Sequence, residues 1–429
     1  MTLTADDKRA RRRPHRAWYV ALIALVAIIG AAGFRATPGV LIGPLEQEFG
    51  WTRGTISMAV SINLVLYGVT APFAAALMDR FGIRRVVSLA LLLVAVGSGL
   101  TVLMNASWQL VLCWGVLVGF GTGAMALAFA ATVADRWFVR HRGLVVGVLT
   151  AGGATGQLIF LPLLAYLAGN EGWRVASLTV SAAALAVVPL VWLLLRDHPQ
   201  DVGTTALGAP ADAPRADPPS GGAARRALRV LGEAARTRSF WMLAGGFAIC
   251  GASTNGLIQT HFIPAAHDHG MPEQTAAGLL ALVGIFDIAG TVLSGWLSDR
   301  VDPRILLIAY YLLRGGSLLI LPSLFDSTVV PSMLIFIVFY GLDWVATVPP
   351  TVALCRAVYG PDGSVVFGWV FASHQVGAGL AAVGAGLTRD IFGEYTFAWY
   401  GAGLLCAIAA VMSARIPKRA SLSGEPVAG

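Results

Sequence analysis

Four ionisable side chains lie within long apolar segments of this sequence: Asp287, Arg314, Asp343 and His374. A charge at the centre of a membrane span costs roughly 2.5–3.5 kcal/mol on insertion scales, so such residues usually face a partner or a water-filled cavity. An arginine neutralises one nearby carboxylate, whereas a carboxyl group left alone in a low dielectric binds a proton more readily. These residue types therefore predict charge pairing and proton exchange inside a membrane.

The four side chains share one predicted depth. At a helical rise of about 1.5 Å per residue, each lies roughly 15–22 Å along its span, close to the middle of a bilayer. The spans are taken to begin near Pro272, Arg304, Pro331 and Gly363. We expect Asp287 to be the structural partner of Arg314, which leaves Asp343 as the site of proton exchange. The reversed assignment and a purely structural ion pair stay open as alternatives.

Lipid must solvate most of the chain that carries these residues. Of its 429 residues 56% are hydrophobic and only 12% are charged, with a mean hydropathy of +0.72, whereas soluble proteins contain about 25% charged residues. The basic N-terminus runs directly into a full-length apolar segment, so no cleavable signal peptide is expected. The cysteines fall in apolar runs without disulfide or zinc spacing and are predicted to be small core residues: Cys113, Cys250, Cys355 and Cys406.

Twelve segments are long and apolar enough to cross a membrane, which takes about 20 residues. They form two sets of six, near residues 17–43, 55–78, 85–104, 108–133, 143–168, 174–195, 240–265, 274–298, 304–322, 330–355, 363–388 and 395–415. The predicted organisation is a basic tail (1–16), a first six-helix bundle (17–195), a linker (196–239), a second bundle (240–415) and a C-terminal tail (416–429).

The linker changes in composition along its length. It is rich in Pro, Ala, Gly and Asp up to Gly222, which predicts a flexible segment. Its end, "AARRALRVLGEAARTRSF", places Arg with Leu and Val at helical spacing, which is typical of a helix at the membrane surface. A solvated basic run is the alternative interpretation of this end.

The basic residues lie mostly on one side of the predicted membrane. Of the 30 Lys and Arg residues, all lie in the tails, the linker and the other even-numbered connections except Arg53, Arg174 and Arg389 in opposite loops and Arg35 and Arg314 within spans. Because cytoplasmic loops accumulate Lys and Arg, both termini should be cytoplasmic. The net charge of +7 then serves topology rather than nucleic-acid binding.

The two sets of spans repeat one turn. After the second span comes "AALMDRFGIRR" with Asp79 and Arg80, and 220 residues later "GWLSDRVDPRI" follows the eighth span with Asp299 and Arg300. Two parallel repeats of six helices, with a binding site between them near the bilayer midplane, are typical of a secondary transporter.

These two loops resemble the signature of the major facilitator superfamily, and the resemblance covers essentially the whole chain. It implies an all-α membrane protein with twelve transmembrane helices in two six-helix pseudo-symmetric bundles. It also implies that Asp79, Arg80, Asp299 and Arg300 hold the cytoplasmic helix ends together in one of the alternating states. The first loop departs from the family pattern at Ala75, where Gly is usual, while the second keeps Gly295.

A narrower resemblance is to the monocarboxylate and oxalate–formate branch, carried by residues 39–68 and 136–163 and by "GWR" at 172–174. The chain departs from that branch where a cation usually follows a proline in the first helix, because Gly39 follows Pro38. It departs again in the eighth helix, because Thr291 and not Arg stands four residues after Asp287. The drug-efflux branch fits less well: its arginine in the fourth helix is absent, with Gly115 at that position, and so is the Gly-Pro pair of its fifth helix.

Several polar residues are candidates to bind a substrate. The resemblance implies that the first helix lines the cavity, where Arg35 could bind a carboxylate in a bidentate way; an arginine that reaches the outer surface is the alternative. Asn255 and Gln259 share one helix face. The predicted substrate-binding set is completed by His261, Asp343, His374 and Gln375, although a buried histidine is often purely structural.

We therefore predict a secondary active transporter in the cell inner (plasma) membrane, with no enzymatic activity and no cofactor or metal. Its expected substrate is a small organic anion such as a monocarboxylate, coupled to protons, and we expect a monomer. The alternative is a proton-driven exporter of a drug or toxic hydrophobic compound. A transporter-like receptor would need a signalling domain, for which the linker and tails are too short. No phosphate-binding loop is present, so ATP cannot be hydrolysed by this chain.

Overall fold

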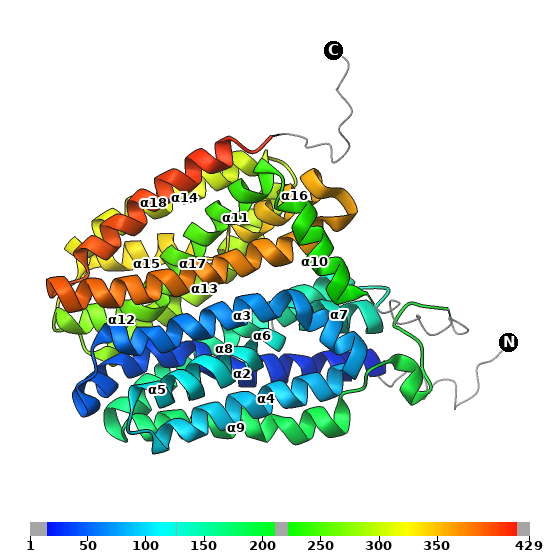
Figure 1. The fold of residues 1–429 in the computed structure, drawn as a ribbon, viewed down its shortest axis with the longest axis horizontal. Helices are drawn as coiled ribbons and strands as arrows, with labels where there is room; N and C mark the ends of the chain where they lie inside the picture. Colours follow the sequence, from blue (N-terminus) through cyan, green and yellow to red (C-terminus); the bar gives the residue numbers. More distant parts are fainter. Residues whose placement is uncertain (1–14, 126, 211–221, 418–429) are drawn as a thin grey trace, which may run out of the picture.

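The computed structural model describes residues 15–125, 127–210 and 222–417, apart from the side chains of Arg35, Ala36, Leu127, Ala128 and Ala154. Helices account for most of these residues, and the β pairing within them is an isolated bridge between Phe138 and Leu207 (Figure 1). Eleven of the described stretches are long and apolar enough to span a membrane. One of the eleven, Pro331–Phe392, runs through three helices and makes two passes, which confirms the predicted all-α fold with twelve spans.

The first bundle contains the N-terminal six spans. Its fourth span is interrupted by a π-helical segment. The elements are α2 (Arg16–Phe49), α3 (Arg53–Phe81), α4 (Ile83–Leu100) with η1 (Thr101–Leu103), then α5 (Ser107–Leu110), η2 (Val111–Val118), α6 (Gly119–Ala124) and α7 (Leu127–Trp137), and finally α8 (Arg142–Asn170) and α9 (Trp173–Leu194).

The second bundle repeats this plan, and two of its spans are interrupted. The seventh span has a π-helical segment in the middle, and the tenth is broken into two helices. The elements are α11 (Arg238–Gly251), η4 (Ala252–Ile258) and α12 (Gln259–Asp268), then α13 (Glu273–Ser298), α14 (Pro303–Ile320) with η5 (Leu321–Leu324), α15 (Pro331–Asp343) and α16 (Val348–Tyr359), η6 (Gly360–Asp362), α17 (Gly363–Phe392) and α18 (Thr396–Ala414).

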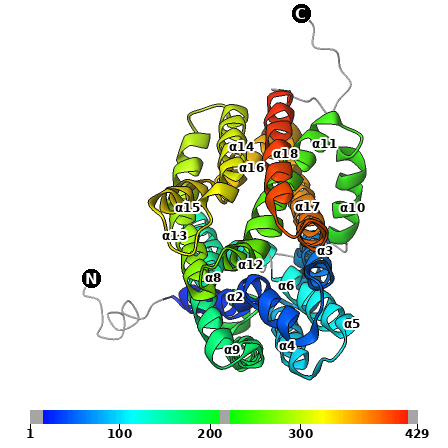
Figure 2. The same ribbon diagram turned by 90° about the vertical axis from the view of Figure 1, so that its left-hand side faces the viewer.

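The two bundles lie side by side with their helices roughly parallel (Figures 1 and 2). The contact between them is made chiefly by α3 against α17 and by α8 against α13. Small residues allow the close approach of α3 and α17: a Cβ atom on Gly68 would lie 2.6 Å from the Cβ of Gln375, and one on Gly386 would lie 2.9 Å from the carbonyl oxygen of Arg53. Glycine is therefore required where these two helices cross the interface.

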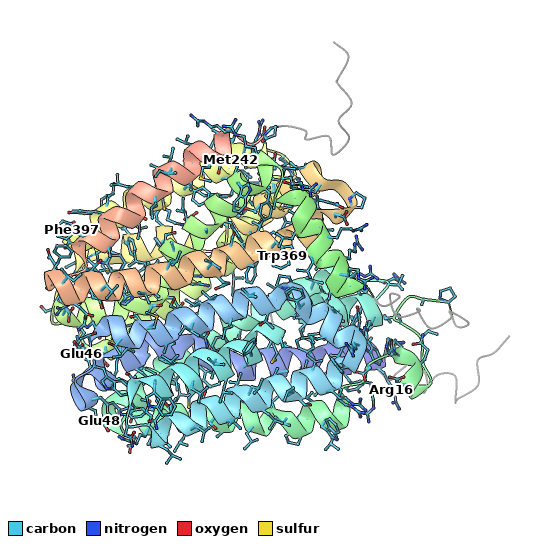
Figure 3. The ribbon with its side chains drawn as sticks, in the orientation of Figure 1. Arg16, Glu46, Glu48, Met242, Trp369 and Phe397 are labelled. Carbon is cyan, nitrogen blue, oxygen red and sulfur yellow. The ribbon has the colours of Figure 1, made fainter. Side chains whose placement is uncertain are left out.

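The long axis of the helices defines two ends of the molecule. We call the end at which α2 begins, near Arg16, the termini end, and the end at which α2 stops, near Glu46 and Glu48, the distal end (Figure 3). The helices alternate in direction, so α3 begins at the distal end with Arg53 and α17 reaches that end with Phe392.

The first part of the linker differs from the flexible segment that its composition predicts. The backbone N–H groups of Val139 and Arg140 donate to the carbonyl oxygen of Leu207, at 2.9 and 3.0 Å, and Asp197 accepts from the backbone N–H of Arg84 at 2.9 Å. These contacts dock residues 196–210 onto the first bundle, while residues 211–221 lie outside the described part of the chain.

The end of the linker forms helix α10 (Ala223–Ala234), which lies across the termini end between the two bundles (Figure 1). Ala227, Val230 and Ala234 make its buried face. The indole N–H of Trp369 donates to the carbonyl oxygen of Ala227 at 3.0 Å and ties the helix to α17. The helix predicted from the spacing of this segment is therefore present, and its apolar face packs against the protein.

Candidate functional site

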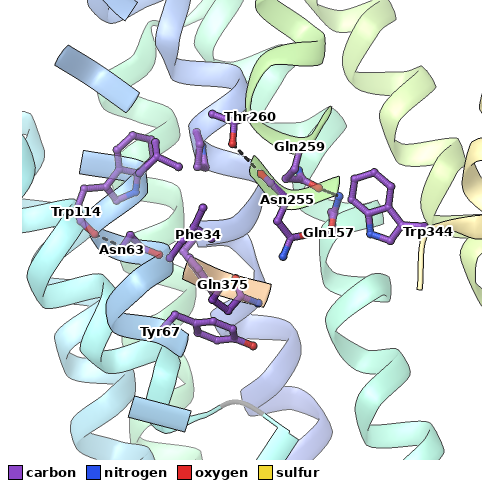
Figure 4. A pocket seen from close by; sticks show the side chains of 13 residues that line it. Phe34, Asn63, Tyr67, Trp114, Gln157, Asn255, Gln259, Thr260, Trp344 and Gln375 are labelled. Carbon is purple, nitrogen blue, oxygen red and sulfur yellow. Dashed lines mark hydrogen bonds between the residues drawn. The ribbon is translucent and has the colours of Figure 1, made fainter. Parts of the chain in front are cut away.

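A cavity of about 70 Å³ lies between the two bundles, midway along the helices. Its walls come from spans of both bundles: α2, α3, the fourth span and α8 on one side, and the seventh span, the α15–α16 break and α17 on the other. The lining residues are Phe34, Pro38, Val60, Asn63, Leu64, Tyr67, Trp114, Gln157, Asn255, Gln259, Thr260, Trp344 and Gln375 (Figure 4).

Side-chain amides and aromatic rings dominate this lining. Gln157 of α8 donates through Nε2 to Oε1 of Gln259 of α12 at 2.6 Å, a hydrogen bond that joins the two bundles inside the cavity. Asn63 donates through Nδ2 to the carbonyl oxygen of Trp114 at 2.7 Å. The described residues of the lining carry no charged side chain, so the walls offer hydrogen bonds and flat apolar surfaces.

Three of the predicted substrate-binding residues line this cavity: Asn255, Gln259 and Gln375. Asn255 and Gln259 project from successive turns of the seventh span, as their spacing predicts. The side chain of Arg35 lies outside the described part of the structure, although the next residue toward the N-terminus, Phe34, is part of the cavity wall.

The other three predicted substrate-binding residues lie elsewhere. His261 is fully buried and its ring nitrogens lie 3.1 Å from the hydroxyl of Tyr395 and 2.8 Å from the carbonyl oxygen of Ala382, toward the distal end. His374 packs against the rings of Phe247 and Phe371, with centroid distances of 4.8 and 5.9 Å. Because adjacent residues point about 100° apart on a helix, Gln375 faces the cavity while His374 faces a neighbouring helix.

Asp343, the third of these, is engaged with Arg314 behind the cavity wall. Nε of Arg314 lies 2.5 Å from Oδ2 of Asp343, and the arginine side chain is wholly inaccessible. The expected pairing of Arg314 with Asp287 is therefore wrong, because Arg314 pairs with Asp343. Asp343 is the last residue of α15, and the packing of α15 against α14 brings it to Arg314, which sequence separation does not reveal.

Asp287 lies close to this ion pair but is held by uncharged groups. Its Oδ1 accepts from the hydroxyl of Thr291 at 3.0 Å and from the backbone N–H of Val345 at 3.1 Å. Within the described part of the chain, no ion pair involves Asp287. The carboxylate without an ion-pair partner in this cluster is thus Asp287. The three residues predicted to share one depth, Asp287, Arg314 and Asp343, lie together in the structure.

A second, larger cavity opens at the termini end and is separated from the first by one pair of rings. This vestibule has a volume of about 880 Å³ and lies between α3 and α7 of the first bundle and α10 and α17. Tyr67 of α3 lines the central cavity and Phe371 of α17 lines the vestibule. Their ring centroids lie 5.9 Å apart in an edge-to-face arrangement, so we call this pair the inner gate.

At the distal end, by contrast, a network of charged residues joins the bundles. Arg53 is only 5% exposed; its guanidinium donates to both carboxylate oxygens of Asp268, each at 2.7 Å, and to Glu46 at 2.8 Å. Asp390 of α17 accepts from the backbone N–H groups of Arg53 and Gly54 at 3.1 and 2.9 Å and caps α3 across the interface.

Two further residues of the second bundle complete this distal lock. Arg389 donates to Asp268 at 2.8 Å. The hydroxyl of Tyr395 accepts from Arg53 at 3.1 Å, and burial raises the pKa of Tyr395, so this hydroxyl stays neutral. From the sequence, Arg53 is predicted only as a charge in a loop. An arginine at the first position of a helix opposes the helix dipole and signals a nearby carboxylate partner.

The two repeated loops at the termini end are not equivalent. Asp79 pairs with Arg136 at 2.6 Å, within the first bundle, while Arg80 is exposed and lies over the ring of Phe81. In the second loop Asp299 and Arg300 are both exposed, and Arg300 lies over the ring of Trp296. Neither of these loops joins the two bundles through its described ion pairs.

Comparison with known proteins identifies the family of this fold. The Major Facilitator Superfamily profile matches residues 23–361 and 253–427. The uncharacterised MFS-type transporter YcxA of Bacillus subtilis (strain 168) is 28% identical, over 90% of this chain and 91% of its own length. Monocarboxylate transporter 13 of Rattus norvegicus is 29% identical over 90% and 85%, and monocarboxylate transporter 11 of Homo sapiens is 27% identical over 94% and 83%.

Solved structures share the fold at lower sequence identity. A bacterial homolog of the human lysosomal transporter Spinster, in an inward-facing and occupied conformation, matches with a TM-score of 0.70 at 17% identity, over 94% of this chain and 96% of its own. A D-xylose-proton symporter matches with a TM-score of 0.69 at 15% identity, over 94% and 98%. At this identity the likeness establishes the arrangement of the helices alone.

Proposed function

The chain belongs to the Major Facilitator Superfamily and is a multi-pass secondary transporter, and we propose that it moves a small organic anion such as a monocarboxylate together with protons. The observation that carries the proposal is the central cavity between the bundles, which is small, rich in amides and next to a surplus buried carboxylate. Curated relatives at 27–29% identity are named monocarboxylate transporters, which supports the same substrate class.

The size of the cavity supports a small substrate. Pockets for drug-sized ligands are roughly 300–1,000 Å³, whereas this one is about 70 Å³. The amide groups of Asn255, Gln157 and Gln375 can donate to a carboxylate, and the rings of Trp114 and Trp344 provide apolar contact for its carbon chain. In this proposal Arg35, which the sequence favours as a carboxylate-binding residue, supplies the compensating positive charge.

The proton is proposed to bind at Asp287. Arg314 neutralises Asp343, so Asp287 is the carboxylate whose charge has no ion-pair partner among the described residues. A buried carboxylate without a charged partner is more stable when it binds a proton than when it stays ionised. Asp343, which the sequence favoured for this role, is proposed instead to stay ionised in the pair.

The alternative substrate, a hydrophobic toxic compound, is favoured by one observation, the aromatic rings in the cavity wall. Phe34, Tyr67, Trp114 and Trp344 all contribute to it. The small volume argues against this alternative, because a drug-sized molecule would have to displace the inner gate as well as fill the cavity.

The proposed location is the inner (plasma) membrane, with both termini in the cytoplasm. The excess of Lys and Arg in the tails and even-numbered connections supports this orientation. The vestibule would then open toward the cytoplasm and the distal lock would close the outer side, which corresponds to an inward-facing state in which the inner gate still covers the central cavity. We propose that the transporter works as a monomer, since the site lies within one chain.

The proposal is tested with purified protein in proteoliposomes. Labelled acetate, propionate, butyrate and benzoate are offered with an acidic exterior, and we expect accumulation of at least one of them that falls as the exterior pH rises. Asp287→Asn should keep exchange of internal for external substrate but lose accumulation driven by the pH gradient. Asp326→Asn, an exposed distal carboxylate, is the control. Failure of all four compounds to enter would contradict the proposed substrate class.

A further inference from the structure

The tenth span is broken in the middle, beside the cavity. α15 ends at Asp343 and α16 begins at Val348, with residues 344–347 in a turn and Pro349 and Pro350 in the first turn of α16. Proline has no N–H group, so these two residues cannot donate to the carbonyl groups that precede them. Inside a membrane the freed backbone groups must find partners within the protein.

Arg314 of α14 supplies partners for the carbonyl groups at the end of α15. Its Nη2 donates to the carbonyl oxygen of Asp343 at 2.6 Å and to that of Trp344 at 3.3 Å. These bonds are additional to the ion pair, which uses Nε. The guanidinium offers five N–H donors in a fixed planar fork, which lets one side chain bind the carboxylate and the two carbonyl groups at once, so the ion pair is only part of what this residue does.

Helix α13 supplies partners for the next part of the turn. Asp287 accepts from the N–H of Val345 at 3.1 Å, and the hydroxyl of Ser294 donates to the carbonyl oxygen of Ala346 at 2.5 Å. Gly290 lies between them on α13 and allows this approach, because a Cβ atom there would lie 1.9 Å from the carbonyl oxygen of Leu342. Side chains from two helices thus hold successive backbone groups of the break.

Within this turn, Trp344 is the residue that lines the central cavity, as Gln157 of the other bundle also does (Figure 4). Its carbonyl oxygen and the next N–H group are the atoms held by Arg314 and Asp287. The placement of this wall of the cavity is therefore fixed by contacts behind it.

We propose that Arg314, Asp287 and Ser294 are positioning residues that hold the α15–α16 break so that Trp344 forms a specificity-determining wall of the substrate site. The inference rests on the proposed function only in taking the central cavity as that site. It gives Asp287 a second role, as a hydrogen-bond acceptor, that is independent of its charge.

The two roles of Asp287 are separated by a pair of variants. Asparagine keeps an acceptor oxygen for the N–H of Val345 but removes the ionisable group, whereas alanine removes both. We expect amide hydrogen exchange of the peptide spanning residues 341–350, measured by mass spectrometry without substrate, to rise about tenfold in Asp287→Ala and to stay near wild type in Asp287→Asn.

Ser294 offers a second, milder variant should Asp287→Ala fold poorly. Ser294→Ala removes the donor to Ala346 and should raise exchange in the same peptide. Ser298→Ala is the matched control, since that hydroxyl lies one turn further along α13 and donates to the carbonyl of Ser294, within the helix itself. Equal exchange in Ser294→Ala, Asp287→Ala and wild type would overturn the proposal.

The placement of Trp344 is measured by its own fluorescence, obtained as the difference between each protein and its Trp344→Phe counterpart. Quenching by acrylamide should increase in Asp287→Ala and Arg314→Lys relative to wild type, because the turn is released. If exchange rises while this quenching stays unchanged, Trp344 is not positioned by the cluster and the proposal is wrong.

Transport then tests the specificity role. The ratio of kcat/KM for butyrate over that for acetate should change in Trp344→Ala and, in the same direction, in Arg314→Lys, and an unchanged ratio in both would overturn that role. If none of the four carboxylates is transported, the proposed function fails, while the exchange and quenching results still support or overturn the positioning of Trp344.

Discussion

The central cavity is closed in two different ways at its two ends. Toward the distal end, Arg53 of one bundle binds Asp268 of the other through two hydrogen bonds of 2.7 Å, and Asp390 caps α3 across the interface. Toward the termini end, the closure is the inner gate, Tyr67 against Phe371, with the vestibule beyond it. One closure consists of a network of charged residues around the buried Arg53, and the other of two rings.

This difference indicates which closure has to be dismantled in each half of a transport cycle. A buried ion pair that loses one partner costs about 3–5 kcal/mol, whereas an aromatic pair contributes about 0.5–1.5 kcal/mol beyond its buried area. Release toward the termini end therefore needs a ring movement, while opening of the distal end needs separation of the bundles and hydration of several charges. In the observed state the distal ion pairs, which take more free energy to separate than the ring pair does, are formed.

The largest predicted effect comes from breaking the distal lock with Asp268→Asn. The variant keeps the shape of the side chain but removes the charge that Arg53 and Arg389 share. Because the Asp268 side chain is 19% exposed and Arg53 keeps its ion pair with Glu46, we expect less than the cost of a wholly buried pair, about 2 kcal/mol, which shifts the equilibrium toward a distally open state by about thirtyfold.

Electron paramagnetic resonance distances measure this shift. Spin labels at Glu171→Cys and Asp326→Cys, in exposed distal loops of opposite bundles, should move apart in Asp268→Asn. Arg174→Ala is the control, because it breaks an ion pair with Glu48 that is also distal but lies within the first bundle. An unchanged distance distribution in Asp268→Asn would mean that the lock does not set the conformational equilibrium.

The second prediction concerns the inner gate. Phe371→Ala removes the ring that separates the vestibule from the cavity. We expect the cavity to become about tenfold more accessible from the termini end, since roughly 1 kcal/mol of ring contact and the steric block are both lost. The rate at which a membrane-impermeant thiosulfonate modifies Asn63→Cys, in the cavity wall, reports this access.

Phe73→Ala provides the matched control for the inner gate. Phe73 and Trp369 form another ring contact between α3 and α17, with centroids 5.6 Å apart, and neither ring lines the cavity. Its loss should leave the modification rate unchanged. Equal acceleration in both variants would show that general loosening of α3 against α17, and not the gate, controls access.

The fold was predictable because its signals are local. Spans follow from runs of apolar residues, and the six-plus-six repeat follows from the matched turns at Asp79 and Asp299. Apolar length is set by the bilayer and needs no knowledge of packing. The same reasoning fails for residues 196–210, where Leu207 and Asp197 dock a Pro- and Gly-containing segment onto the bundle through tertiary contacts.

The site was predictable only in part, because facing directions depend on how helices rotate against each other. The common depth of Arg314, Asp287 and Asp343 came from helical rise alone, and the structure brings them together. Which carboxylate pairs with Arg314 depends on how α13 and α15 rotate against α14, and the sequence does not give that rotation. Gln375 and His374 lie at the same depth but on different faces of α17. Depth therefore made both candidates for the substrate site, although only Gln375 lines the cavity.

Two groups of site residues were not predicted from the sequence, for different reasons. Asn63, Trp114 and Gln157 are single polar or aromatic residues within apolar spans and carry no motif, so only the assembled interface singles them out. Arg53 was visible as a charge opposing the helix dipole at the start of a span. Its partner Asp268 could have been sought among the acidic residues at the ends of distal helices.

The third prediction concerns the hydrogen bond that joins the two bundles inside the cavity. Gln157→Leu removes the 2.6 Å hydrogen bond that joins the bundles there and leaves Oε1 of Gln259 without that donor. A net hydrogen bond contributes about 1 kcal/mol, so we expect KM for the transported carboxylate to rise about fivefold with little change in the distal distances.

The double variant Gln157→Leu/Gln259→Leu distinguishes the cost of an unpaired amide from the loss of a substrate contact. Replacing both partners by apolar groups relieves the first cost but not the second. A KM that returns toward wild type assigns the effect to the amide pair; a KM that rises further assigns it to binding of substrate by both amides.

The smallest predicted effect is at the rim of the vestibule, where Arg226 of α10 pairs with Asp362 at 2.7 Å. Both side chains are substantially exposed, at 53% and 31%, and exposed pairs contribute about 0–1 kcal/mol. Asp362→Asn should therefore leave uptake and the distal distances unchanged and shift the melting temperature by no more than a few degrees. The helix stays docked through its buried face and the bond from Trp369 to Ala227. A large loss of uptake in Asp362→Asn would mean that charges also latch the termini end, and the asymmetry between an ionic outer closure and an aromatic inner one would then be wrong.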